Sequence, residues 1–221
     1  MTFAHNFDAT SLREYDIRGI VGKTLSAEDA FAIGRTFGSM VRRNGGRTLV
    51  VGYDGRLSSP MLEEALVQGA VECGLEVTRV GRGPTPMLYY ASAIFEADGA
   101  IMVTGSHNPP DYNGFKMMLA GKPFFGAQIK ELGELAAQGN VVAHEEGSVR
   151  EADVRDDYVA RLVKDYVGGE RKLKSVWDNG NSSAGEILEK LVAALPGEHI
   201  VLNAAIDGTF PAHHPDPTVA K

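Results

Sequence analysis

Cysteine is almost absent from this sequence, as are long hydrophobic runs and any N-terminal signal-peptide pattern. The single cysteine, Cys73, cannot form an internal disulfide, and its apolar helical neighbourhood predicts a small buried residue. No run of residues is long enough to span a bilayer. These absences argue against a disulfide-stabilised or membrane-spanning protein and predict a cytoplasmic location.

An excess of basic residues is missing too. The chain has 22 lysines and arginines against 29 aspartates and glutamates, which gives a net charge of −7 and a pI of about 5.4. This balance argues against a nucleic-acid or membrane partner, because such binders need a basic face. A small anionic substrate is still compatible, since local cations such as Arg18, Arg56 and Lys116 can dominate a cleft.

The overall composition is that of an ordinary globular protein, with 43% hydrophobic and 23% charged residues. Helical and strand-like patterns alternate along its 221 residues, which predicts βαβ units and a mainly parallel sheet. The expected helices are 27–42, with Ser26 as N-cap, 60–73, with Ser59 as N-cap, 87–95, 127–138, 153–166 and 185–194. The expected strands are 48–52, 75–80, 100–103, 174–178 and 199–203, with a hairpin-like segment at 115–119 and a short edge strand within 140–149.

The helix and strand pattern restarts near residue 150. This predicts a first domain over 1–149 and an incomplete second α/β domain over 150–221. Right-handed connections bring the carboxyl ends of parallel strands to one edge of a sheet. The segments 53–56 and 83–86 and Ser106 should therefore face a common crevice, which is where open α/β sheets bind ligands.

The most informative segment is 104–116, with the sequence TGSHNPPDYNGFK. Ser106 follows an apolar strand, and the two prolines after Asn108 stiffen the loop. The pair Asn113-Gly114 is typical of a tight turn, which would fold Lys116 back toward Ser106. A serine on a rigid loop beside a cation suits a group that carries and donates a phosphoryl. For an isolated serine, the alternative of a turn-capping residue would be favoured.

This segment resembles the phosphoserine loop of the α-D-phosphohexomutases, most closely that of the phosphomannomutase/phosphoglucomutase branch. A second segment, 13–22, resembles a family segment that lines the active site beside the phosphoserine. The resemblance implies an α/β first domain with a mixed, mainly parallel sheet and helices on both faces. It also implies that Ser106 is the phosphoserine, that Arg18 contacts the transferring phosphoryl and that Tyr15 contacts the sugar. The alternative for Arg18 is an ion pair with Asp16 or Glu14 on a surface turn.

Two further pairs of residues leave alternatives open. His107 could orient the phosphoserine or move a proton, or it could be a packing group, since adjacent side chains on extended backbone point in opposite directions. Lys116 ranks above His107 as the acid or base, although a nearby dianion would raise its pKa. Asp54 and Arg56 could orient the site, but a structural ion pair that holds the loop is favoured.

The second domain carries weaker family motifs. Residues 178–185 resemble a structural strand-to-helix turn of the family, with Ser182 in place of the usual glycine. Residues 207–217 also resemble a family segment, and they contain His213 and His214. Metal binding by these two histidines is disfavoured, because the neighbouring prolines make a stiff loop rather than a ligand face.

Members of the family are longer than this chain. They carry a D-G-D-x-D-R loop whose aspartates hold Mg²⁺ next to the phosphoserine, and this loop is missing here. The resemblance therefore implies the N-terminal portion of a mutase, in which Ser106 would touch Mg²⁺ only through its phosphate. We expect negligible turnover by the 221 residues alone, and self-association through the incomplete second domain.

The activity that the resemblance implies is an intramolecular phosphotransfer. Phosphorylated Ser106 gives its phosphoryl to a hexose phosphate, and a hexose 1,6-bisphosphate is the intermediate and activator. Arg18 and Lys116 neutralise charge, and both bind substrate together with Tyr15. The net reaction interconverts the 1- and 6-phosphates of mannose or glucose. The alternatives are a phosphoglucosamine or phosphopentose mutase, and a non-catalytic module that binds a phosphosugar. Neither a Walker loop nor a kinase signature is present.

Overall fold

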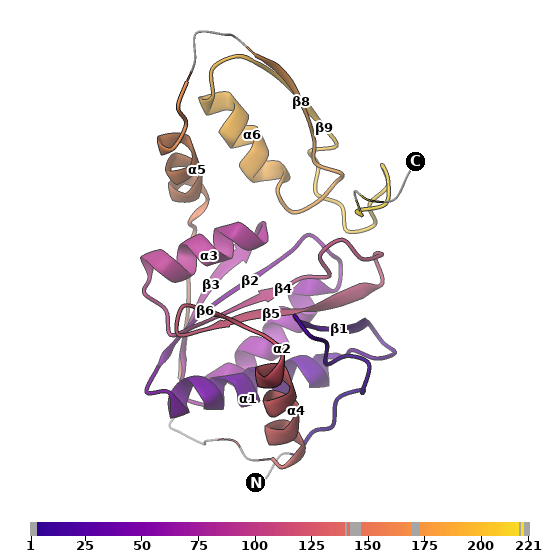
Figure 1. Cartoon of the computed structure of the whole chain (residues 1–221), viewed down its shortest axis with the longest axis vertical. Helices are drawn as coiled ribbons and strands as arrows, with labels where there is room; N and C mark the ends of the chain where they lie inside the picture. Colours follow the sequence, from indigo (N-terminus) through magenta and orange to yellow (C-terminus); the bar gives the residue numbers. More distant parts are fainter. Residues whose placement is uncertain (1–3, 140, 142–146, 169–172, 217, 219–221) are drawn as a thin grey trace.

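The computed structural model describes residues 4–139, 141, 147–168, 173–216 and 218. They form two α/β units, with a seven-stranded sheet in the first and a two-stranded sheet in the second (Figure 1). The strands are β1 (Ile17–Ile20), β2 (Thr48–Tyr53), β3 (Glu76–Arg82), β4 (Gly99–Val103), β5 (Tyr112–Leu119), β6 (Lys122–Phe124), β7 (Ser148–Glu151), β8 (Lys174–Asp178) and β9 (Glu198–Leu202). The helices are α1 (Ala27–Arg43), α2 (Ser59–Val71), α3 (Thr85–Ile94), α4 (Ala127–Ala137), α5 (Arg155–Lys164) and α6 (Gly185–Ala194).

The first sheet is mixed, as predicted. Its order is β1-β5-β4-β2-β3-β7, with β6 paired to β5. The neighbours β4, β2, β3 and β7 run parallel, whereas β5 is antiparallel to β4, β1 and β6. From β2 the chain continues to β3 on one side, whereas from the neighbouring β4 it continues to β5 on the other side. The loops after β2 and β4 therefore leave the sheet at a topological switch point, where α/β sheets commonly bind a ligand.

Helices cover both faces of this sheet, which confirms the predicted arrangement. Leu49 and Val51 of β2 face one apolar core, which β2 shares with α1, α2 and α4. Val50 points to the opposite face and joins a second core with α3, α5 and α6. Alternate residues of a strand point to opposite faces, so one short run of apolar residues serves two cores. The second core connects the two units, because Tyr158 and Ile187 belong to the second unit.

The helix starts show where local signals were sufficient. Ser26 caps α1, as predicted, and Asp29, which was not predicted to take part, completes a capping box. The prediction for α2 was wrong by one residue, because Ser58 is the N-cap and Ser59 is the first helical residue. The hydroxyl of Ser59 donates to Asp54 at 2.6 Å, so this side chain binds a tertiary partner and does not cap the helix.

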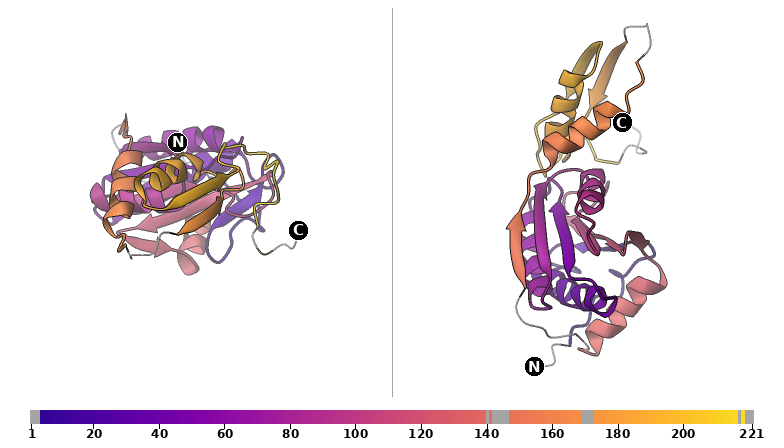
Figure 2. Two further views of the ribbon diagram at one scale, coloured as in Figure 1. Left: turned by 90° about the horizontal axis from the view of Figure 1, so that it is seen from above. Right: turned by 90° about the vertical axis from the view of Figure 1, so that its left-hand side faces the viewer.

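The second unit begins where the chain leaves the first sheet. β7 is the edge strand that the sequence predicted, and it crosses the expected boundary between residues 149 and 150. The unit lies beyond α3 at one end of the molecule (Figures 1 and 2). Three large apolar side chains on β8 and β9, Val176, Ile200 and Leu202, are exposed. Self-association through this unit stays a prediction. Among the described residues, no helix is long and apolar enough to cross a membrane.

The last residue of β8 in the second unit is a carboxylate, Asp178, that accepts several hydrogen bonds. The side-chain amide of Asn203 and the backbone N–H of Gly180 donate to Asp178, and together they lower the pKa of this carboxyl to about 2. A carboxyl with a depressed pKa stabilises the folded state above its ordinary pKa of 3.8, and this contribution is lost as the pH falls toward 2. His213 adds a further contact to Asp178 at 2.9 Å.

The isosteric substitution Asp178→Asn tests this contribution. It removes the charge and keeps the shape, so the variant should be less stable than the parent at about pH 6, and the difference should shrink as the pH falls through the range from 3.8 to about 2. Fluorescence of Trp177, the only tryptophan and the neighbour of Asp178, would follow urea unfolding of this unit at each pH. A difference that is constant with pH would show that the charge of Asp178 is not the stabilising feature.

Candidate active site

Ser106 stands at the carboxyl end of β4, where the sequence placed it. It is exposed and lines a cavity of about 410 Å³ between the two units. The other lining residues are Asp54, Gly55, Pro84, Thr85, Pro86, Thr104, His107, Ser182, Ser183, Ala184, Phe210 and Pro215. The segments 53–56 and 83–86 therefore do meet Ser106, as the strand-end argument predicted.

The backbone of Ser106 is in the left-handed region, with φ of 55°. This conformation is uncommon for a residue with a side chain, and it persists only where neighbours hold it. The Ser106 N–H donates to Thr104 Oγ1 at 2.9 Å, and the Asn108 side chain and N–H both donate to the Gly105 carbonyl. The sharp bend lifts the Ser106 hydroxyl out of the sheet toward the cavity.

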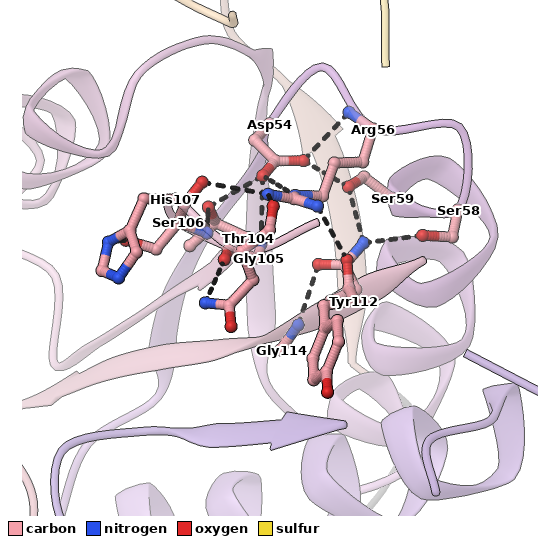
Figure 3. A network of polar contacts seen from close by, with 12 residues as sticks. Asp54, Arg56, Ser58, Ser59, Thr104, Gly105, Ser106, His107, Tyr112 and Gly114 are labelled. Atoms are coloured by element: carbon pink, nitrogen blue, oxygen red, sulfur yellow. Dashed lines mark hydrogen bonds and ion pairs between the residues drawn. The ribbon is translucent and has the colours of Figure 1, made fainter. Parts of the chain in front are cut away.

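Arg56 holds the loop through its backbone carbonyls (Figure 3). Its side chain is fully buried, and its guanidinium donates to four carbonyls of the loop, those of Ser106, Asn108, Pro109 and Tyr112, at 2.5 to 3.0 Å. The remaining donor, Nε, reaches Asp54 Oδ2 at 3.1 Å. All five N–H groups are thus used, which only the planar fork of an arginine can achieve. Burial lowers the pKa of Arg56 and Asp54 opposes this shift.

Asp54 joins the loop to the first turn of α2. Its Oδ2 accepts from the Thr104 hydroxyl at 2.8 Å and from the Gly105 N–H at 3.1 Å. Its Oδ1 accepts from Ser59 and from the Arg56 N–H. The interpretation of Asp54 and Arg56 as an ion pair that holds the loop is therefore confirmed. The pair is more than a local contact, because it fixes the backbone on both sides of Ser106.

The turn predicted at Asn113-Gly114 is wrong. Both residues lie within β5, and the chain reverses earlier, between Ser106 and Asp111. Asn113 is buried and donates its side-chain amide to Ser58 and Ser59. Gly114 lies opposite Arg18 of β1, where an added Cβ would come within 2.2 Å of the Ile17 carbonyl oxygen. The glycine allows the two strands to approach closely. In the sequence, the pair Asn113-Gly114 cannot be told apart from a turn by composition alone.

Gly105 offers a direct test of this packing. A Cβ at Gly105 would lie 2.4 Å from Arg56 Cζ, and five hydrogen bonds prevent the guanidinium from moving away. Gly105→Ala should therefore lower the free energy of unfolding by about 1–3 kcal/mol, the usual cost of overpacking. Urea denaturation would measure it, with Gly133→Ala as control, because a Cβ there meets only the flexible end of Leu12. Equal stability of the two variants would contradict a rigid Arg56.

A second group of charges lies on β1 and β5. Asp16 pairs with the Arg18 guanidinium, and Lys116 Nζ lies 3.4 Å from Asp16 Oδ2. Arg18 does pair with Asp16, as the alternative proposed, but both side chains are buried; Arg18 is on β1 and Asp16 is in the bend just before it. The buried Nε of Arg18 has no hydrogen-bond partner among the described residues. Because this nitrogen has almost no accessible surface, a ligand would reach it only if neighbouring groups moved.

Comparison with known proteins gives these charges a context. The family model for phosphoglucomutase/phosphomannomutase, alpha/beta/alpha domain I, matches residues 9–141, which is more than half of the chain. The chain belongs to the phosphoglucomutase/phosphomannomutase family. The match includes both Ser106 and the charged residues of β1 and β5.

Three relatives show how far the family likeness extends. The chain is 45% identical over 214 residues to a phosphomannomutase/phosphoglucomutase of Pseudomonas aeruginosa, covering 97% of this chain and 46% of the relative. It is 44% identical over 211 residues to a phosphoglucomutase of Neisseria meningitidis, covering 95% and 45%. A crystal structure of a family protein from Burkholderia thailandensis superposes with a TM-score of 0.90 at 45% identity, covering 96% and 48%. The chain spans about half the length of the curated relatives it matches.

Within this member of the family, the predicted site residues fall in two places. Ser106 and His107 line the 410 Å³ cavity, whereas Tyr15 and Lys116 line a second cavity of about 270 Å³ with Tyr89, Met117, Pro123, Phe124 and Phe125. His107 Nδ1 lies 3.3 Å from the Ser106 hydroxyl oxygen. The positive φ of Ser106 breaks the alternation of extended backbone, so the two adjacent side chains can meet. Figure 3 shows the imidazole at the outer side of the loop, away from Arg56.

Several contributors were missed by sequence reasoning. Thr104 and Asn108 brace the loop through side-chain hydrogen bonds, and Phe210 reaches the cavity from the second unit. Thr104 and Asn108 lie within the same segment as Ser106, so their closeness in the sequence could have indicated that they hold the loop. Phe210 lies more than a hundred residues away in sequence, and no local pattern joins it to Ser106.

The described residues do not fit a metal site. They contain no group of three histidine, cysteine, aspartate or glutamate side chains that could hold a metal ion. The carboxylate nearest the loop, Asp54, already accepts five hydrogen bonds. His213 is engaged with Asp178 and with the His214 carbonyl. A Mg²⁺ ion bound to a phosphate on Ser106 would need protein ligands from outside the described residues.

Proposed function

We propose that this chain carries the phosphoryl-accepting serine of a hexose-phosphate mutase. The observation that supports it most is the exposed hydroxyl of Ser106 on a loop whose carbonyls are tied to the buried Arg56. A group that must accept and return the same phosphoryl gains from fixed geometry, because phosphoryl transfer is catalysed mainly by positioning and charge stabilisation. The names of the relatives support mannose or glucose phosphates as substrates.

Phosphoryl uptake by Ser106 is a displacement at phosphorus. The Ser106 oxygen attacks one phosphorus of a hexose 1,6-bisphosphate, the Oγ–P bond forms, and the bond from that phosphorus to the sugar oxygen breaks. The hydroxyl proton of Ser106 passes to His107 when its Nδ1 is unprotonated, since the two atoms are 3.3 Å apart. The sugar oxygen takes up a proton from solvent, and the sugar leaves as a hexose monophosphate. In the full cycle this uptake is the second transfer. Phosphorylated Ser106 first gives its phosphoryl to the free hydroxyl oxygen of a hexose monophosphate, the resulting bisphosphate reorients, and Ser106 then takes up the phosphoryl from the other sugar oxygen.

The charged group on β1 and β5 supports the sugar-phosphate side of this proposal. Arg18 and Lys116 both contact Asp16, and Lys116 also lines the aromatic cavity that contains Tyr15. Tyr15 is 72% exposed and can pack against a sugar ring without rearrangement. No step here is assigned to a metal ion, because the described residues supply no ligand set.

The half-reaction tests the proposal without requiring full turnover. Glucose 1,6-bisphosphate mixed with unphosphorylated chain should release glucose monophosphate in an amount that approaches one equivalent per chain, read by a coupled dehydrogenase assay. Addition of glucose 1-phosphate to the phosphorylated chain should reverse the transfer. Release that continues far beyond one equivalent without a phosphoprotein would indicate a phosphatase, and no release would contradict the proposed function.

A further inference from the structure

A segment of the second unit packs directly against the turn that holds Arg56. The Phe210 ring lies over the guanidinium, with Arg56 Cζ 5.0 Å from the ring centroid. The neighbouring backbones are so close that a Cβ on Gly208 would come within 2.7 Å of the Gly55 carbonyl oxygen. A Cβ on Gly55 would lie 2.5 Å from Ile206 Cγ2. Residues 206–210, the coupling segment, thus fit the first unit closely.

The coupling segment is fixed within its own unit. The Asp207 N–H donates to the Asn181 carbonyl at 3.0 Å, and the Asn181 side chain donates to the Ala205 carbonyl at 2.9 Å. The Phe210 N–H donates to the Asp207 carbonyl at 3.0 Å. Asn181 belongs to the turn between β8 and α6, so the coupling segment should follow any movement of that turn.

Phe210 contacts the part of Arg56 that the serine loop does not use. The in-plane N–H groups of the guanidinium reach the loop carbonyls and Asp54, and the ring covers its face. A cation is attracted to the face of an aromatic ring, and removal of water strengthens the hydrogen bonds that the same cation makes. If the ring moves away, water reaches the guanidinium and competes with the loop carbonyls for its donors.

We propose that Phe210 is a positioning residue, which couples the placement of the second unit to the geometry of the Ser106 loop. Movement of the second unit away from the sheet would uncover Arg56 and loosen the loop, and docking would tighten it. The units also touch elsewhere, because Glu186 of the second unit pairs with Arg82 of β3. Loss of the Phe210 ring should therefore loosen the loop without detaching the unit. The consequence for phosphoryl uptake rests on the proposed function, whereas the coupling itself does not.

Hydrogen exchange of the 221-residue chain tests the coupling. In Phe210→Leu, which keeps an apolar side chain but has no ring, amides of residues 104–113 should exchange about 2- to 30-fold faster, the range that a lost cation–π contact allows. Peptides from β2 and β3 should be unchanged. Phe210→Tyr keeps the ring and should restore the protection of the parent. Tyr166→Leu, an exposed aromatic elsewhere in the second unit, is the matched control and should leave the loop unchanged.

Two results would overturn the proposal. In the first, a folded Phe210→Leu chain shows the same loop exchange as the parent. In the second, Phe210→Tyr shows loop exchange as fast as that of Phe210→Leu. If the leucine variant fails to fold, Phe210→Met provides the same comparison. The outcome is separable from the proposed function, because exchange is measured without substrate. A chain that shows the coupling but accepts no phosphoryl would sustain this inference and contradict the function.

Discussion

Replacement of Arg56 by methionine is expected to lower the free energy of unfolding by about 3–5 kcal/mol, the loss seen when one partner of a buried ion pair is removed. The side chain is fully buried, so methionine would fill much of the volume but leave Asp54 without its cation. The four loop carbonyls would lose their donors at the same time. Unsatisfied buried acceptors add to the loss.

Urea denaturation followed by circular dichroism would measure this change over the whole chain. Arg161→Met is the matched control, because Arg161 forms an exposed i,i+4 pair with Asp165 that should contribute no more than about 0.5 kcal/mol. Arg56→Lys should be intermediate, since lysine restores the charge but cannot make five directed hydrogen bonds. If Arg56→Met were as stable as Arg161→Met, Arg56 could not be the support of the loop.

Removal of the Ser106 hydroxyl is expected to reduce phosphoryl uptake from glucose 1,6-bisphosphate by a factor on the order of a thousand or more, as for the loss of a covalent nucleophile. The effect should be confined to chemistry. Because the side chain is exposed, Ser106→Ala should change the free energy of unfolding by no more than about 0.5 kcal/mol. Release of glucose monophosphate in the half-reaction measures the loss.

Two other serines line the same cavity and provide controls. Ser182 and Ser183 lie on the turn before α6, and neither is joined to the Arg56 network. Ser183→Ala should retain uptake within a few-fold of the parent. Undiminished uptake by the Ser106→Ala variant would mean that another group in the cavity accepts the phosphoryl.

The sequence predicted features that depend on local periodicity and on strand ends. The helix α1 and its cap at Ser26 were found because the signal lies within a few residues. The meeting of the segment 53–56 with Ser106 followed from the common edge of parallel strands. The ion pair of Asp54 and Arg56 was expected because the two residues are only two positions apart in the sequence.

Features that depend on distant partners were out of reach. Asn113-Gly114 has the composition of a turn, yet tertiary contacts with β1 and α2 hold it in a strand. The four carbonyl partners of Arg56 could not be predicted, since they lie about fifty residues away and carry no side-chain signal. The contact of Phe210 with Arg56 bridges an even longer separation.

The location of the phosphoryl after uptake tests the central claim most directly. The chain would be incubated with glucose 1,6-bisphosphate, digested and mapped by tandem mass spectrometry under conditions that preserve phosphoserine. The account predicts a single phosphate on Ser106, which is lost when glucose 1-phosphate is added. A phosphate on Thr104, Ser182 or Ser183 instead, or an unmodified Ser106 in a chain that has released glucose monophosphate, would contradict it.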